Sequence, residues 1–135
     1  MTARVASCSC GRLRAEVRGE PTGVSICHCH ACQRRTGSVF GAQARFPRES
    51  VALEGAGTEF VRVGDAGGRF RFTFCPRCGS TVFYVEEGDE GRIAIPVGAF
   101  ADPGFPAPTI SVYEERRHSW VSVPDDAERW RGDPA

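Results

Sequence analysis

Seven cysteines constrain the fold of this 135-residue chain more than any other feature, because they occur in three tight groups. The groups are Cys8 with Cys10, Cys27 with Cys29 and Cys32, and Cys75 with Cys78. Thiolates two or three residues apart can face one centre, because a tight turn brings both sulfurs within the ~2.3 Å reach of a zinc–sulfur bond. The spacing therefore predicts metal centres around which the chain must fold.

The first and third groups share a local pattern. In each group the second cysteine is followed by a glycine, Gly11 or Gly79, and both groups lie between runs that are typical of strands. Glycine adopts the left-handed conformation that lets a backbone fold under a metal ion. We therefore predict one closed, structural zinc site with four thiolate ligands. Its predicted ligands are Cys8, Cys10, Cys75 and Cys78.

The middle group differs, because Cys32 is followed by a polar and basic turn rather than by glycine. Three protein ligands leave an open coordination position for water or substrate, which is the pattern of a catalytic zinc. We predict a second, open zinc site held by Cys27, Cys29 and Cys32, so that two zinc ions per chain account for all seven cysteines. Arg34 and Arg35 either attract an anionic substrate to this site or form a solvated basic turn.

Three other interpretations of the cysteines stay open. One is a single four-cysteine site with three spare buried thiols, since free cysteine often packs as a small hydrophobe. A second is an iron–sulfur centre, for which the ligand type is right but the usual spacings are not met. A third is a redox pair formed by Cys75 and Cys78, although that motif usually opens a helix and this pair lies between strand-like runs. Metal binding by all seven cysteines is the preferred interpretation.

Two histidines interleave with the middle group. On an extended backbone His28 points away from Cys27 and Cys29, so a hydrogen-bonding role beside the metal is preferred over ligation. His30 lies in the following turn, where ligation stays open. His118 lies in a charged stretch and is expected to be exposed. Beyond the open zinc held by Cys27, Cys29 and Cys32, the sequence assigns no catalytic group.

Alternation of apolar and polar residues predicts a mainly β chain. The predicted strands cover residues 13–18, 40–46, 61–63, 70–74, 82–85, 93–95, 110–112 and 120–123. Glycine-containing loops at 64–68 and 87–91 predict two hairpins, and the aromatic stripe of Phe70, Phe72 and Phe74 is expected in the core. At most one short helix is expected, at 31–36, and the proline-rich stretch 102–108 is expected to be irregular. We predict a single domain over 1–135, with a frayed tail from 129 to 135.

The composition excludes several classes of function. The 17 basic residues are all arginine, and the absence of lysine excludes Schiff-base chemistry and a P-loop. A formal net charge of zero argues against nucleic acid as the main partner, and no stretch approaches the ~18 apolar residues of a membrane helix. No apolar segment typical of a secretory signal follows Met1. We therefore expect a cytoplasmic protein, in a reducing compartment where clustered cysteines indicate metal rather than disulfides.

Motif order and spacing resemble those of a known family. The motifs are Cys8-Ser9-Cys10-Gly11, then Cys27-His28-Cys29-His30-Ala31-Cys32 with Gly37-Ser38 after it, and Phe74-Cys75-Pro76-Arg77-Cys78-Gly79-Ser80. They resemble the glutathione-dependent formaldehyde-activating enzyme family, which also includes centromere protein V. The segment 97–103 and Trp120 extend the likeness, which covers about residues 6–125. In its late strand the family often carries histidine before the aromatic residue, where this chain has Ser111-Val112-Tyr113.

The resemblance implies a zinc-bound β-tent fold of short antiparallel sheets. It implies a structural zinc on Cys8, Cys10, Cys75 and Cys78, and a second, open zinc on Cys27, Cys29 and Cys32. The implied activity is that of a carbon–sulfur lyase similar to S-hydroxymethylglutathione synthase, with a small-molecule thiol and a small aldehyde as partners and neither nucleic acid nor membrane. The alternative is a non-catalytic, zinc-containing module that binds a thiol or a protein. A zinc-knuckle module for nucleic acid is disfavoured by the zero net charge.

Overall fold

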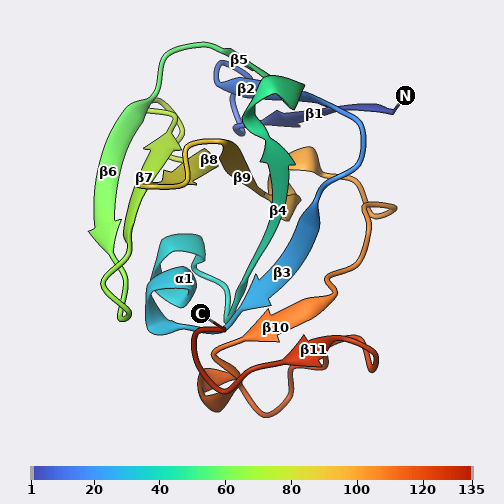
Figure 1. The fold of residues 1–135 in the computed structure, drawn as a ribbon. Coiled ribbons are helices and arrows are strands. Elements are labelled where there is room, and N and C mark those ends of the chain that lie inside the picture. Colours follow the sequence, from blue (N-terminus) through green and yellow to red (C-terminus); the bar gives the residue numbers. More distant parts are fainter. Residues whose placement is uncertain (1, 135) are drawn as a thin grey trace. The chain divides into compact units, whose positions relative to one another are not determined.

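The computed structural model describes residues 2–134, and Figure 1 shows the order of the elements along the chain. The chain divides into two compact units. The first unit comprises the chain up to residue 22 together with residues 44–105, and the second comprises residues 23–43 and the chain from residue 106 onward. The single domain expected from the sequence stays a prediction. No helix within residues 2–134 has the length and apolarity needed to cross a membrane.

The described residues form eleven strands, one short α-helix and three 3-10 turns, which confirms the mainly β class. The strands are β1 (Ala3–Ser7), β2 (Arg14–Arg18), β3 (Gly23–Cys27), β4 (Gly41–Pro47), β5 (Val51–Glu54), β6 (Thr58–Val63), β7 (Arg69–Phe74), β8 (Thr81–Glu86), β9 (Arg92–Pro96), β10 (Ile110–Val112) and β11 (Glu128–Arg129). The helical elements are α1 (His30–Thr36), η1 (Arg48–Ser50), η2 (Val97–Phe100) and η3 (Glu114–Arg116). The helix predicted at 31–36 is therefore confirmed.

In the first unit, β1, β2 and β5 form a three-stranded antiparallel sheet in the order β1-β2-β5. The predicted alternation in β2 is confirmed, because Ala15 and Val17 are fully buried while the arginines beside them are exposed. Leu13, just before β2, is also buried. This sheet carries the first two cysteines in the turn between β1 and β2.

In the same unit, strands β9, β8, β7 and β6 are antiparallel neighbours in that order within a larger sheet, so both predicted hairpins are confirmed. Phe72 lies opposite Tyr84 and stacks on it with ring centroids 4.5 Å apart. The aromatic stripe is only partly in the core, because Phe70 and Phe74 are half-buried while Thr73 is buried. A register shift between Thr73 and Phe74 breaks the strict alternation that the prediction assumed.

The second unit departs from the purely antiparallel expectation. Strand β10 pairs in parallel with β3, placing Val112 beside Cys27, and pairs in parallel with β11 on its other side. Parallel neighbours need a long connection, and more than eighty residues separate β3 from β10 in the chain. This pairing places residues 110–112 directly beside the strand that leads into the middle cysteine group.

Two predictions near the C-terminus are wrong. Residues 120–123 form no strand: Val121 and Val123 are buried, but Trp120 is 71% exposed and the Val121 N–H closes a turn onto His118. Residues 129–132 are not a frayed tail, because the Trp130 N–H donates to the Ser111 carbonyl and further backbone bonds reach Gly132. The tail is held because β11 extends the parallel pairing of β10.

Gly55 offers a test of how closely the chain packs behind the first cysteine turn. Its φ is +97°, and a Cβ there would lie 2.0 Å from the Arg12 carbonyl oxygen. We expect Gly55→Ala to lower the free energy of unfolding by more than about 2 kcal/mol, since the left-handed conformation alone costs about 1–2 kcal/mol. The measurement is urea-induced unfolding followed by circular dichroism.

Gly67→Ala is the matched control, because Gly67 has a φ of +89° and no atom within 4 Å of the added Cβ. We expect it to show only the conformational cost of about 1–2 kcal/mol. Equal losses in the two variants would contradict the role assigned to the close approach at Arg12.

Candidate metal centres

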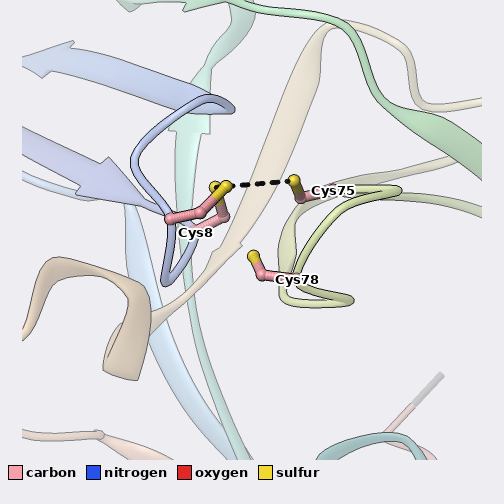
Figure 2. Close-up of side chains that lie close together, drawn as sticks. Cys8, Cys75 and Cys78 are labelled. Atoms are coloured by element: carbon pink, nitrogen blue, oxygen red, sulfur yellow. Dashed lines mark hydrogen bonds between the residues drawn. The ribbon is translucent and has the colours of Figure 1, made fainter.

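The first cysteine group comes together in the first unit, from the turn after β1 and the turn between β7 and β8. The four sulfur atoms of Cys8, Cys10, Cys75 and Cys78 all lie within 4.8 Å of one another. Cys10 Sγ lies 3.7 Å from Cys8 Sγ and 3.6 Å from Cys75 Sγ. Ligands about 2.3 Å from a tetrahedral ion stand about 3.8 Å apart, so this group has the dimensions of a four-thiolate metal site. Figure 2 shows the sulfurs of Cys8, Cys75 and Cys78 turned toward one another.

The two turns are built alike. In each, the first cysteine donates its N–H to the carbonyl five residues later, and the glycine after the second cysteine donates back to the first cysteine. The bonds are Cys8 to Leu13 (3.0 Å), Gly11 to Cys8 (3.1 Å), Cys75 to Ser80 (3.0 Å) and Gly79 to Cys75 (2.8 Å). Gly11 and Gly79 have φ values of +83° and +79°, which confirms the left-handed glycine predicted at both turns.

Hydrogen bonds tie the two turns to each other and to the sulfurs. The Ser9 N–H donates to Ser80 Oγ at 3.3 Å, and the two hydroxyl oxygens lie 3.0 Å apart. The Leu13 N–H donates to Cys8 Sγ at 3.2 Å. The pKa of Cys78 is lowered to about 5 by three hydrogen-bond donors. The Ser80 N–H has the largest effect, followed by the Ser80 hydroxyl and the Cys10 N–H. These donors favour the thiolate, which is the form a metal ion requires.

At Cys10 the neighbouring sulfurs oppose ionisation instead. The pKa of Cys10 is raised to about 11: the Arg12 N–H works against the rise, but burial and the neighbouring sulfurs of Cys75 and Cys8 outweigh it. Thiolates this close repel, and a cation among them removes the repulsion. None of the seven cysteines forms a disulfide. The group can therefore hold a metal ion.

The second group comes together in the second unit, where β3 gives way to α1. Cys27 ends β3, Cys29 caps the helix, and Cys32 lies in its first turn. The three sulfurs lie within 4.8 Å of one another, and Cys29 Sγ accepts the Cys32 N–H at 3.3 Å. Cys27 and Cys32 are buried while Cys29 is partly exposed. No other cysteine, histidine or carboxylate of residues 2–134 joins this group.

The pKa of the Cys27 thiol is raised, chiefly because it is hydrogen-bonded to Cys29 and then to Cys32, with burial adding to the rise. A metal ion bound here would reverse this preference, since it binds the deprotonated form. The second group can therefore also hold a metal ion, with fewer protein ligands than the first.

The histidines near the second group lie outside its set of sulfur ligands. His28 is fully buried and outside the sulfur group, with its Nε2 2.9 Å from Ser111 Oγ. His30 begins α1, is exposed, and is not brought into the group either. His118 is exposed as expected, and its Nε2 lies 3.1 Å from the side-chain oxygen of Gln33. Arg34 is exposed and Arg35 is half-buried, both near the end of α1.

Three polar residues around His28 were not indicated by the sequence. The Gln33 amide donates to the His28 carbonyl at 2.8 Å. Ser111 donates its hydroxyl proton to the Glu114 carboxylate, which also pairs with Arg117 at 3.2 Å and with Arg129 at 3.0 Å. Ser111 and Glu114 lie more than eighty residues beyond His28, so no local spacing signalled them.

The sequence and the fold were compared with those of known proteins. A family model described as "Glutathione-dependent formaldehyde-activating enzyme" matches residues 3–116, a range that holds all seven cysteines. A crystal structure of a Rhodobacter sphaeroides protein matches with a TM-score of 0.56 and 18% identity, covering 93% of this chain and 98% of that one. At this identity the likeness concerns the fold alone. A search of curated proteins returns no match.

Glu114 makes the stability of the chain depend on pH. Burial raises the pKa of this carboxyl, but the Ser111 hydroxyl and the Arg129 charge outweigh it, so the pKa lies below its ordinary value. A lowered pKa contributes stability that is complete above the unfolded value and is lost as the pH falls through the folded one. We expect Glu114→Gln to cost about 1–2 kcal/mol of unfolding free energy near pH 7, and the difference from wild type to shrink below about pH 4.

The measurement is urea-induced unfolding of both proteins between about pH 7 and pH 3. The matched control is Glu115→Gln, because the Glu115 side chain is 41% exposed and lies 3.9 Å from Arg131. We expect this control to resemble wild type across the range. A Glu114→Gln difference that stays constant with pH would contradict the prediction.

Proposed function

The chain belongs to the glutathione-dependent formaldehyde-activating enzyme family, and from this premise we propose that it is a zinc-dependent enzyme that joins a thiol to a small aldehyde. In the reaction the thiol sulfur bonds to the carbonyl carbon, the carbon–oxygen double bond becomes single, and the thiol proton ends on that oxygen. The product is an S-hydroxymethyl compound when the aldehyde is formaldehyde. In the reverse direction the same chemistry is a carbon–sulfur lyase reaction.

The observation that carries this proposal is the difference between the two cysteine groups. Four sulfurs converge in the first, whereas only three converge in the second within the described part of the chain. Four thiolates complete a tetrahedral ion, while three leave one position for water or a substrate. The partly exposed Cys29 places the second group within reach of solvent.

An all-sulfur donor set suits zinc, so we assign a structural zinc to Cys8, Cys10, Cys75 and Cys78. A second zinc would be held by Cys27, Cys29 and Cys32. Bound there, zinc supplies Lewis acidity that favours the thiolate form of a substrate and polarises a carbonyl oxygen.

The chain's own side chains have a supporting part in this proposal. Arg34, which is exposed two residues after Cys32, would attract the carboxylates of an anionic thiol such as glutathione. The buried Cys27 and Cys32 anchor the site, and Cys29 offers the accessible side. The proposed setting is the cytoplasm, where thiols stay reduced. The alternative function is a non-catalytic module that binds a thiol or a protein at the same open site.

Two cysteine variants test the division into a closed and an open site. We expect the purified chain to hold about two zinc ions, one for each sulfur group. Cys29→Ser should remove about one zinc and leave the fold intact, because the second site does not close the turns of the first unit. Cys78→Ser should unfold the chain, because a structural zinc contributes folding energy directly.

The measurements are zinc analysis by mass spectrometry and far-ultraviolet circular dichroism. A wild-type content of one zinc would contradict the assignment of two sites. Similar loss of structure in both variants would show that the two sites do not divide into structural and open ones.

The activity is tested by the exchange of formaldehyde with thiols, followed by nuclear magnetic resonance. We expect the wild-type chain to accelerate formation of the S-hydroxymethyl product with at least one of glutathione, cysteine and other small thiols. Cys29→Ser should lose the acceleration, since it lacks one ligand of the open site. Absence of acceleration with every thiol would favour the binding module over the enzyme.

A further inference from the structure

His28 lies between two cysteines of the second group and is fixed by hydrogen bonds from its backbone and its side chain. Its N–H donates to the Val112 carbonyl at 3.1 Å, its carbonyl accepts from Gln33 at 2.8 Å, and its Nε2 lies 2.9 Å from Ser111 Oγ. The side chain is 0% exposed. Three polar groups of this one residue are therefore bonded to β10 and to α1, so the backbone between Cys27 and Cys29 has little freedom.

The direction of the side-chain hydrogen bonds follows from Glu114. This carboxylate is 14% exposed and pairs with two arginines, so it is ionised and can only accept. The Ser111 hydroxyl donates to it and thereby uses its one proton. Ser111 Oγ must then accept from His28, which places a proton on His28 Nε2.

The surroundings of the other ring nitrogen favour the same tautomer. His28 Nδ1 is buried and has no hydrogen-bond partner among the described residues. A buried N–H without an acceptor is costly, so the neutral ring with its proton on Nε2 is the form that fits this site. The chain of bonds thus selects one tautomer and one ring orientation.

We propose that Ser111 and Glu114 are positioning residues that hold His28 in this tautomer and orientation, and through it hold the Cys27–Cys29 loop ready for the second metal ion. The inference rests on the proposed function insofar as it needs a metal at the second group. Groups that orient a metal site without touching the ion typically change metal affinity by tenfold or more when removed.

The test uses the full-length, zinc-loaded chain labelled with nitrogen-15 at histidine. Long-range proton–nitrogen correlation spectra report the tautomer of each ring, and His30→Gln and His118→Gln variants assign the His28 signals by elimination. We expect wild-type His28 to carry its proton on Nε2. In Glu114→Gln the neutral amide can donate to Ser111 as well as accept from it, so the Ser111 proton is no longer fixed. We expect the form of His28 protonated on Nδ1 to become detectable beside the Nε2 form, as the minor one because Nδ1 has no acceptor.

Zinc affinity is the second readout, measured by competition with a chromophoric chelator. Ser111→Ala and Glu114→Gln are each expected to weaken the second zinc about tenfold and to leave the first unchanged. The matched controls are Ser122→Ala and Glu115→Gln, which change exposed side chains of the same types. Glu114→Gln keeps the shape of a partly exposed side chain, so the test stands even where Ser111→Ala fails to fold.

A wild-type His28 protonated on Nδ1 overturns the inference. So does a second-site zinc affinity that is unchanged in both variants. Failure of the proposed function looks different, because it shows as a missing second zinc or missing thiol–aldehyde chemistry in the wild-type chain. The tautomer readout does not depend on either of those results.

Discussion

Mutual repulsion among clustered sulfurs is the constraint on which the structure of the first unit depends. Four sulfurs within 4.8 Å cannot all ionise without a cation among them. The two turns that carry them are built alike, from a left-handed glycine and a matching pair of backbone hydrogen bonds. The Ser9–Ser80 contact joins the turns directly, so a metal ion would complete an arrangement that the backbone has already prepared.

The second unit also gathers cysteine sulfurs, but it brings together three rather than four. Three sulfurs meet where β3 passes into α1, and the structure supplies polar contacts around the loop rather than a fourth thiolate. A structural site gains from complete coordination, whereas a reactive site needs a free position and a rigid surround. The two groups therefore suit the two roles assigned to them in the proposed function.

The sequence predicted the local elements well where side-chain alternation was regular and poorly where pairing depended on distant strands. Ala15 and Val17 are buried as their alternation indicated, whereas the register shift after Thr73 leaves Phe74 only half-buried. Residues 120–123 are apolar enough for a strand but find no partner strand. Trp130 is held, against expectation, because a parallel neighbour reaches it.

The sequence by itself determined the two cysteine groups, because ligand spacing and a following glycine are local properties that act within a single turn. It also indicated that His28 would point away from the sulfurs, since alternation on an extended backbone is equally local. Only the tertiary structure decided what His28 meets there. Ser111 lies 83 residues away in the chain. It reaches the imidazole because β10 pairs in parallel with β3, and a pairing between strands so far apart in sequence depends on the tertiary structure rather than on local sequence.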